Sequence, residues 1–256
     1  MENKALTDKT AGGVFKMLSD SGAMEMIYDH TKKMMWSVVE YKEMQMLYTC
    51  AMKEIQTKLE VLDTEFKVRY KRNPISSVSS RLKRTESVME KMLRRGYPFS
   101  MESIQKNVND IAGVRVICSY VDDIYAIADA LLAQDDVTLI ARKDYIKEPK
   151  PNGYRSLHLI VSIPVFLSES KKNVKVEVQI RTIAMDYWAS LEHQMKYKKD
   201  IPDAERVSRE LRDVADRMAE TDEKMLKLRR DIELAEDVKS DDDELLDRLS
   251  RVGMPI

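Results

Sequence analysis

The feature that most constrains the fold is a strict alternation of apolar and polar residues in VKVEVQIRT (residues 174–182). Successive side chains of a β-strand point to opposite faces of the sheet. The segment therefore predicts a strand whose faces differ in character. One face carries Val174, Val176, Val178 and Ile180, and the other carries Lys175, Glu177, Gln179 and Arg181. The polar face is either a solvated surface or the place where the chemistry occurs.

A second segment, RSLHLIVSIPV (residues 155–165), repeats this pattern. It places Leu157, Leu159, Val161 and Ile163 on one face, and Ser156, His158 and Ser162 on the other. Two such strands side by side could form a reactive surface. VRVICSY (114–120) and VTLIARKDY (137–145) predict two more strands, while residues 122–133 and 184–198 predict helices. This interleaving predicts a mixed α/β (α+β) core over residues 74–200.

Helical segments flank the predicted core. Residues 23–73 contain no glycine and no proline before Pro74, which predicts one or two long helices, and residues 1–22 are expected to fray. A further helix is expected from Ser76 or Ser77 to just before Gly96. Its expected buried stripe is Val78, Leu82, Met89 and Leu93.

The segment 201–236 carries a heptad pattern, and residues 237–256 form an acidic tail. The apolar positions alternate at spacings of four and three, with Thr221 as an interruption. They are Val207, Leu211, Val214, Met218, Thr221, Met225, Leu228 and Ile232. Such a stripe needs a partner helix. The partner is either a second copy of the chain or the helix of residues 23–73.

Composition limits the class of protein. With 43% hydrophobic and 34% charged residues, the chain can bury a core, and a net charge of -1 excludes a general polycation. Cys50 and Cys118 suggest neither a disulfide framework nor a zinc site. No apolar run reaches the ~18 residues of a membrane span, so no membrane partner is expected and the cytoplasm is the expected location.

Two carboxylates are candidates for metal binding. Asp110 alone is more often a helix cap than a ligand. Paired in space with Glu177, it could bind Mg²⁺, which takes one or two carboxylates and leaves its other positions to phosphate and water. Gly113 and Gly153 are expected to mark a special backbone conformation or a close approach, because the chain has only seven glycines.

A basic stripe of Lys83, Ser87 and Lys91, spaced by four residues, is expected on one face of the helix after Ser77. Such a stripe is either a solvated surface or a site that neutralises polyphosphate. No GxxxxGK[ST] or GxGxxG motif occurs, so side chains would have to hold the phosphates. The three histidines, His30, His158 and His193, do not form a His-Asp metal cluster of the kind that phosphohydrolysis needs.

The stretch KPNGYRSLH (residues 150–158) is open to two interpretations. It could be an ordinary hairpin turn. It could also be a loop that holds the Tyr154 ring and several positive groups against a nucleotide.

Together these segments resemble the synthetase domain of the RelA/SpoT family, and most of all its small alarmone synthetases. The resemblance rests on SSRLKRTESVMEK, DIAGVRVICSYVDDIY, KDYIKEPKPNGYRSLH and VEVQIRTIAMDYWASLEHQ, in that order. It implies a nucleotidyltransferase-like fold with a mostly antiparallel sheet. It also implies transfer of the β,γ-pyrophosphate of ATP to the 3′-hydroxyl of GTP or GDP, giving (p)ppGpp and AMP, with Mg²⁺ as cofactor.

The resemblance also implies residue roles. Arg81 and Arg115 would sandwich the adenine of ATP, and Lys83, Ser87 and Lys91 would contact its phosphates. Asp110 and Glu177 would hold Mg²⁺, with Glu177 also taking the proton of the attacking hydroxyl. Tyr154 would stack on guanine. The other acceptor contacts would be Lys143, Lys150, His158, Gln179 and Asp186.

Some points depart from the family pattern or stay open. Asp186 stands where small synthetases often have Asn, which leaves an acceptor other than guanine, such as an adenine nucleotide or the 3′ end of tRNA, as an alternative. A catalytically inactive nucleotide-binding scaffold is a second alternative. The family's His-Asp hydrolase domain is absent from the sequence, which implies synthesis without degradation. The resemblance points to a homotetramer, and nothing in the sequence supports an RNA partner.

Overall fold

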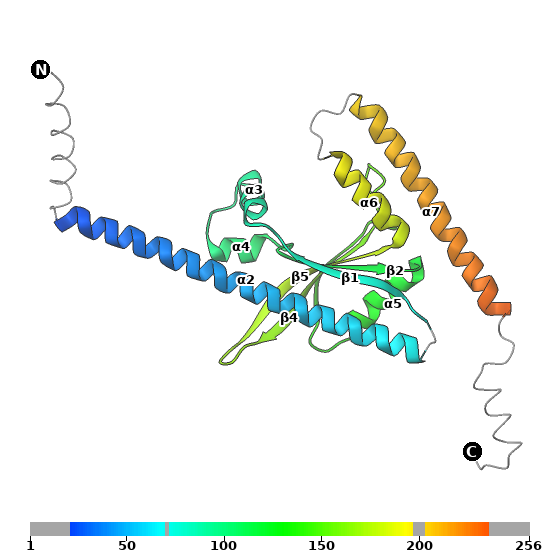
Figure 1. The fold of residues 1–256 in the computed structure, drawn as a ribbon, viewed down its shortest axis with the longest axis horizontal. Helices are drawn as coiled ribbons and strands as arrows, with labels where there is room; N and C mark the ends of the chain where they lie inside the picture. The colour runs from blue at the N-terminus through cyan, green and yellow to red at the C-terminus, as the bar shows by residue number, and fades with distance from the viewer. Residues whose placement is uncertain (1–20, 70–71, 197–202, 236–256) are drawn as a thin grey trace, which may run out of the picture.

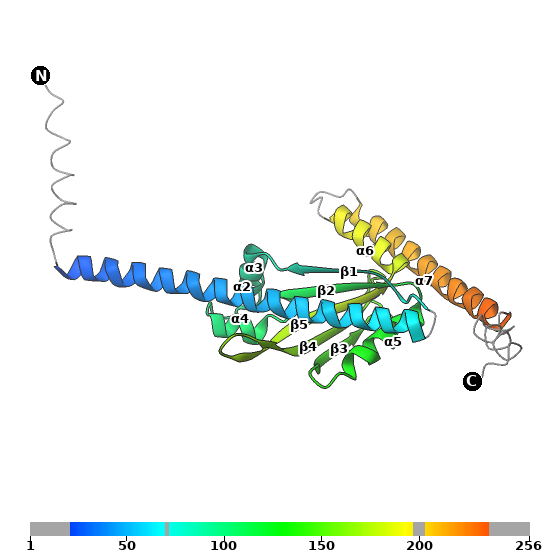
Figure 2. The same cartoon turned by 60° about the horizontal axis from the view of Figure 1, so that its bottom comes forward.

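The computed structural model describes residues 21–69, 72–196 and 203–235. Residues 1–20 of the segment expected to fray, and the expected acidic tail of residues 237–256, lie outside these ranges. Ser21 and Gly22, also expected to fray, begin helix α2, so the expectation is wrong for these two residues. Helix α2 (Ser21–Arg69) is continuous, as the absence of helix-breaking residues predicts. It crosses the sheet, and its N-terminal end extends beyond the rest of the fold (Figures 1 and 2).

The sheet has five strands in the order β1-β2-β5-β4-β3. Strands β2 and β5 are parallel, and the other neighbouring pairs are antiparallel. The strands are β1 (Ile75–Leu82), β2 (Ala112–Cys118), β3 (Thr138–Asp144), β4 (Leu157–Phe166) and β5 (Lys171–Thr182). The predicted mixed, mostly antiparallel sheet is confirmed.

One predicted helix is wrong at its N-terminal end. Residues 75–82, expected to be mostly helical, form the edge strand β1, which pairs antiparallel with β2 from Ile75↔Cys118 to Leu82↔Ala112. The helix starts later, as α3 (Thr85–Arg95), so Lys83 lies in the connection before it. Its buried residues are Val88 and Met92, whereas Met89 and Leu93 are exposed. A short helix, α4 (Met101–Asn107), was not predicted.

The core lies between one face of the sheet and the helices α2 and α5 (Val121–Leu132). The parity predicted for β5 is confirmed, because Val174, Val176, Val178 and Ile180 are buried in this core. They meet α2 side chains such as Ile55 and Leu59, which are also fully buried. Burial also raises the pKa of the Cys118 thiol, as expected for a core cysteine.

Helices α6 (Ile183–Lys196) and α7 (Ala204–Ala235) complete the fold. Helix α7 packs mainly on α6 and α5, while α2 packs mainly on the sheet and α5. The interpretation that α2 covers the heptad stripe within the chain is therefore wrong. Leu211 and Met218 pack against Trp188 of α6. The stripe's members Val214, Met225, Leu228 and Ile232 are exposed.

Among the described residues, no helix is both long and apolar enough to cross a membrane.

Candidate functional site

The polar face of the sheet brings the predicted site residues together in rows. Backbone pairing aligns Ser79, Arg115, Gln179, His158 and Lys143 in one row across all the strands. An adjacent row contains Arg81, Gly113 and Glu177. The order of the strands, with β5 between β2 and β4, thus places Gln179 between Arg115 and His158. Residues from all five strands become neighbours in this way.

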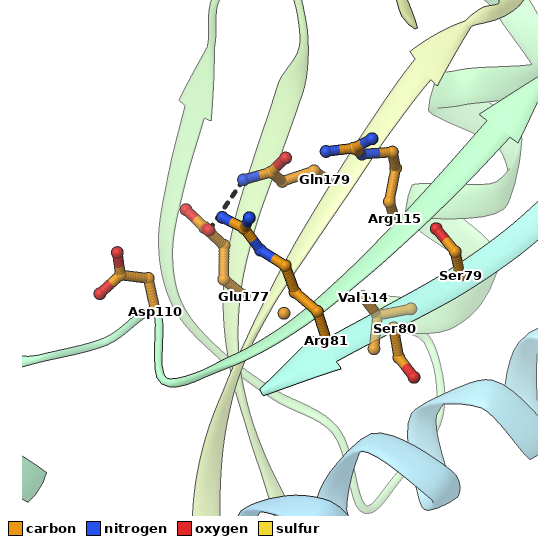
Figure 3. A pocket seen from close by; sticks show the side chains of 9 residues that line it. Ser79, Ser80, Arg81, Asp110, Val114, Arg115, Glu177 and Gln179 are labelled. Atoms are coloured by element: carbon orange, nitrogen blue, oxygen red, sulfur yellow. Dashed lines mark hydrogen bonds between the residues drawn. The ribbon is translucent and has the colours of Figure 1, made fainter. Parts of the chain in front are cut away.

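A cavity of about 240 Å³ opens on the β1-β2-β5 side of this face. Figure 3 shows Arg81, Asp110 and Glu177 around it, with Gln179 and Arg115 farther along the same face. The remaining lining residues are Ser79, Ser80, Gly113 and Val114. A Cβ added to Gly113 would meet Arg81 O at 3.7 Å, which is an ordinary contact. The expectation of a special backbone conformation or a close approach is therefore wrong at Gly113.

Asp110 is held between two lysines. Lys83 Nζ donates to Oδ2 at 2.7 Å, and Lys91 Nζ donates to Oδ1 at 2.7 Å. Burial alone would raise the pKa of Asp110, but these hydrogen bonds and charges outweigh it and hold the pKa below its ordinary value. The carboxylate is therefore ionised at neutral pH. Lys83 belongs to this cluster although it lies outside α3.

Glu177 is held by the next polar side chains on the sheet. His158 Nδ1 lies 3.2 Å from Oε1, and Gln179 Nε2 donates to Oε2 at 2.8 Å. Burial would raise the pKa of Glu177, but the contacts with His158 and Gln179 lower it below its ordinary value. The nearby Asp110 charge acts in the opposite direction. The two carboxylates are thus both ionised and close enough to interact.

These two carboxylates fit a hard divalent cation. Mg²⁺ accepts one or two carboxylates and completes its shell with water and phosphate oxygens. Within the described ranges, no group of three or more His, Cys, Asp and Glu residues could hold a metal by protein ligands alone. The set therefore suits a cation that arrives with a polyphosphate. With such a ligand bound, Lys83 and Lys91 would donate to the phosphate oxygens instead of to Asp110.

The turn of residues 150–153 carries the candidate acceptor residues. Gly153 N donates to Lys150 O at 2.8 Å, which closes a Lys-Pro-Asn-Gly turn. Lys150 Nζ lies 4.6 Å from the ring centroids of both Tyr145 and Tyr154. Burial lowers the pKa of Lys150. The ammonium thus covers the Tyr154 ring, and a base can stack at this place only after Lys150 has moved.

Arg181 connects the acceptor residues, and the sequence did not single it out. Its guanidinium donates to Tyr154 OH at 2.6 Å, to Gln179 Oε1 at 2.9 Å and to Asp186 Oδ1 at 3.2 Å. The Tyr154 hydroxyl also lies 2.8 Å from His158 Nε2, and burial raises the pKa of Tyr154. Alternation had placed Arg181 on the polar face, but nothing in the sequence marked it as the centre of a network.

Asp186 bridges the two halves of the site. Its Oδ1 lies 3.3 Å from Arg115 NH1 and 3.2 Å from Arg181 NH1. Arg115 of β2 and Arg181 of β5 therefore share one carboxylate. Burial and the charge of Arg181 both lower the pKa of Arg115.

The remaining predicted residues, Ser87 and Lys143, do not line this cavity. Ser87 is one helical turn before Lys91 on α3. Lys143 is exposed on β3 opposite His158. Two further residues, Tyr145 and Lys175, were not proposed for the site. Lys175 Nζ donates to Gln105 O and Asn109 Oδ1, at 3.2 Å and 3.0 Å, and so fixes the segment just before Asp110.

Comparison with known proteins agrees with this geometry. Residues 80–202 match the model of the region found in RelA / SpoT proteins. The GTP pyrophosphokinase YwaC of Bacillus subtilis is 40% identical over 205 residues, which are 79% of this chain and 97% of that protein.

Solved structures agree as well. The crystal structure of small alarmone synthetase 2 from Bacillus subtilis is 41% identical, with a TM-score of 0.68, over 75% of this chain and 99% of that one. Small alarmone synthetase 1 from the same organism, bound to its product pppGpp, is 36% identical, with a TM-score of 0.69, over 76% and 98% of the two chains.

Ionised carboxylates among lysines and arginines on an open sheet suit the class of enzymes that transfer phosphate groups, where catalysis depends on positioning and charge neutralisation. Within that class, the chain belongs to the RelA/SpoT family, and the small alarmone synthetases are among the relatives that it matches.

Proposed function

We infer that this chain is a GTP pyrophosphokinase that transfers the β,γ-pyrophosphate of ATP to the 3′-hydroxyl of GTP or GDP, giving (p)ppGpp and AMP. The observation that carries this conclusion is the pair Asp110 and Glu177 in one cavity, with lysines on one side and the His158–Gln179 row on the other. The relatives named GTP pyrophosphokinase and the pppGpp-bound synthetase support the substrates.

We propose that ATP binds on the β1-β2 side. Arg81 and Arg115 are planar, permanently charged groups in the cavity and suit the two faces of adenine. Lys83, Ser87 and Lys91 lie on and just before α3, where they would contact the phosphates. When bound by Asp110 and Glu177, Mg²⁺ would neutralise charge on the transferred pyrophosphate.

In the proposed transfer, the acceptor 3′-oxygen attacks the β-phosphorus of ATP. The bond between that phosphorus and the α,β-bridging oxygen breaks, and AMP leaves with the bonding electrons. Glu177 takes the hydroxyl proton, and His158 Nδ1 orients the carboxylate that receives it. Most of the rate enhancement would come from positioning and charge neutralisation.

We propose that guanine binds on the β4-β5 side. Tyr154 would stack on the base after Lys150 has moved from its ring. Asp186 would accept hydrogen bonds from guanine, and Lys143, Lys150, His158 and Gln179 would contact the ribose and phosphates. Because Asp186 is shared by Arg115 and Arg181, filling the acceptor site would alter the contacts of the donor-side arginine.

Thin-layer separation of labelled products tests the activity. ATP is offered with GTP, GDP, GMP, excess ATP or tRNA as acceptor, in the presence of Mg²⁺. Product with GTP or GDP supports the proposal, whereas product only with an adenine nucleotide or with tRNA would identify a different acceptor. No transfer to any acceptor would favour the inactive scaffold.

We also propose that the chain forms a homotetramer through its terminal helices and works in the cytoplasm, where ATP and GTP are available. The exposed apolar residues Val214, Met225, Leu228 and Ile232 on α7 support an oligomer, because such a stripe is stabilised by covering it.

A further inference from the structure

Helix α7 lies directly against the turn that carries Tyr154. Gly153 has a φ of +88°, and a Cβ at this residue would come within 2.6 Å of the Ala215 Cβ and 3.3 Å of the Arg212 Cα. Any larger residue would therefore clash with the helix and strain the backbone. The expectation of a close approach at Gly153 is confirmed, and the approaching element is α7.

Arg155 joins the turn to this helix. Its NH1 donates to Gly153 O at 3.1 Å and to Ala215 O at 3.3 Å, and its NH2 donates to Asp216 Oδ1 at 2.9 Å. Arg155 is mostly buried, with its side chain 16% exposed. One guanidinium therefore holds the backbone of the turn and the side of the helix together. Arg212 adds a contact from α7, with NH1 donating to Pro151 O at 3.0 Å.

Helix α7 is itself anchored to the rest of the fold. Trp188 Nε1 of α6 donates to Leu211 O at 2.8 Å, and Thr182 Oγ1 of β5 donates to Asp222 Oδ2 at 2.6 Å. Farther along, Arg229 pairs with Asp122 at the start of α5, at 2.6 Å. These anchors lie on both sides of the contact with the turn. The helix is therefore a fixed support for residues 150–155.

We propose that α7 is a positioning element for the acceptor nucleotide, acting through the Arg155–Asp216 pair. Neither residue touches the reacting atoms. By holding the turn, they keep Tyr154 beside His158 and Arg181, so less conformational freedom is lost when the acceptor binds. The proposal rests on the function inferred above. It predicts that loss of the pair raises the KM for the acceptor nucleotide but not the KM for ATP.

The test compares full-length Asp216→Ala, Arg155→Gln and Arg155→Lys with the wild type. The matched control is Asp213→Ala, on the same helix, whose carboxylate pairs with Arg217 at 2.9 Å and has no bond to the turn. For Asp216→Ala we expect the KM for GTP to rise about threefold to tenfold, because a partly exposed charged contact is lost. The KM for ATP and kcat should stay within about twofold.

Arg155→Gln should show a larger rise in the KM for GTP than Asp216→Ala, and Arg155→Lys should lie between the wild type and Arg155→Gln. The control should match the wild type. A KM for GTP within twofold of the wild type in both Asp216→Ala and Arg155→Gln would overturn the proposal. Equal rises for GTP and ATP would also overturn it, because Arg155 would then act only in general stability.

Hydrogen exchange on the nucleotide-free chain gives a second, independent readout. The amides of Lys150 and Gly153, which donate to Tyr154 O and Lys150 O, should exchange faster in Asp216→Ala than in the wild type or Asp213→Ala. The proposal requires this result as well, and unchanged exchange would refute it. If the wild type made no (p)ppGpp, the inferred function would fail, yet the exchange experiment would still decide whether α7 holds the turn.

Discussion

Replacing Arg181 by methionine tests whether the hydrogen-bond network beneath the acceptor site is functional. The Arg181 side chain is 6% exposed. It donates to Tyr154 OH, Gln179 Oε1, Asp186 Oδ1 and Ser156 Oγ over distances of 2.6 to 3.3 Å. Methionine fills much of the same volume without donating to any of these acceptors, so the substitution separates hydrogen bonding from packing.

The structure sets the size of the stability effect. Tyr154, Gln179 and Asp186 each keep another partner, namely His158 at 2.8 Å, Glu177 at 2.8 Å and Arg115 at 3.3 Å. Gln179 contacts Glu177 through Nε2, so its Oε1 loses the Arg181 donor. Each lost bond should cost about 0.5–1.5 kcal/mol, with the bond to Gln179 Oε1 at the upper end of that range. Removing a buried charge offsets part of this sum. The expected net loss in the free energy of unfolding is therefore about 1–3 kcal/mol.

The substitution should also weaken binding of the acceptor nucleotide. Without Arg181, the Tyr154 hydroxyl keeps only the His158 contact, and the ring loses one of the two cations near it. Stacking of a base on an aromatic side chain contributes about 1–3 kcal/mol, so a misplaced ring should raise the KM for GTP by at least about fivefold. The KM for ATP should change much less, because Arg181 does not line the cavity proposed for ATP.

The assays are thermal unfolding and initial rates with each nucleotide varied in turn. The expected shift of the unfolding midpoint is roughly 2–4 °C for each kcal/mol lost. Arg181→Lys, which keeps the charge but not the planar fork, should have an intermediate KM for GTP. A large thermal shift with an unchanged KM for GTP would mean that Arg181 serves folding alone. No change in either quantity would contradict the network itself.

Four further predictions concern the site and the assembly. Glu177→Gln should abolish pyrophosphate transfer in a labelled-ATP assay without unfolding the chain, and activity within a few-fold of wild type would remove Glu177 from the mechanism. Tyr154→Ala should raise the KM for GTP much more than the KM for ATP, with stacking worth about 1–3 kcal/mol, and equal effects would mean that the ring is structural. The pKa values of Asp110 and Glu177 lie below their ordinary values of 3.8 and 4.5, so their stabilisation is present above those values and is lost as the pH falls through the folded pKa values. A pH–rate profile should then show no loss from either carboxylate between about pH 8 and pH 5.5, and a decline with a carboxylate pKa near 6–7 would contradict this. Light scattering after size exclusion should give four times the chain mass of 29.7 kDa, and a single-chain mass at micromolar concentration would refute the tetramer.

The central strands could be predicted because their residues encode them locally. In β4 and β5, the alternating residues decide which face is buried, and the structure follows this parity. Strand β1 could not be found in the same way. Its sequence, ISSVSSRL, is rich in serine and runs into a good helix-forming segment. It becomes a strand by pairing with β2, whose residues lie 30 or more positions farther along the chain.

The sequence predicted some residues that the structure brings together on the polar face, but it did not predict their contacts. Asp110 and Glu177 were paired as possible metal ligands, and the structure places both in one cavity. The lysine bridges to Asp110 and the sharing of Asp186 by two arginines depend on side chains from separate elements. No spacing rule along the chain encodes such contacts. Arg181 looked like any other polar residue of an alternating strand until the structure showed it to be buried.

The heptad stripe of α7 shows how one periodic pattern can serve two surfaces. The spacing of apolar residues predicted a single seam, but the helix turns Leu211 and Met218 toward Trp188 and leaves Val214, Met225 and Leu228 exposed. The side that faces the core uses Ala215, whose small side chain permits the contact with Gly153. A second molecule that packed on the exposed side would therefore contact the same helix that holds the turn of residues 150–153. The exposed stripe and the contacts with the turn of residues 150–153 therefore lie on the same helix.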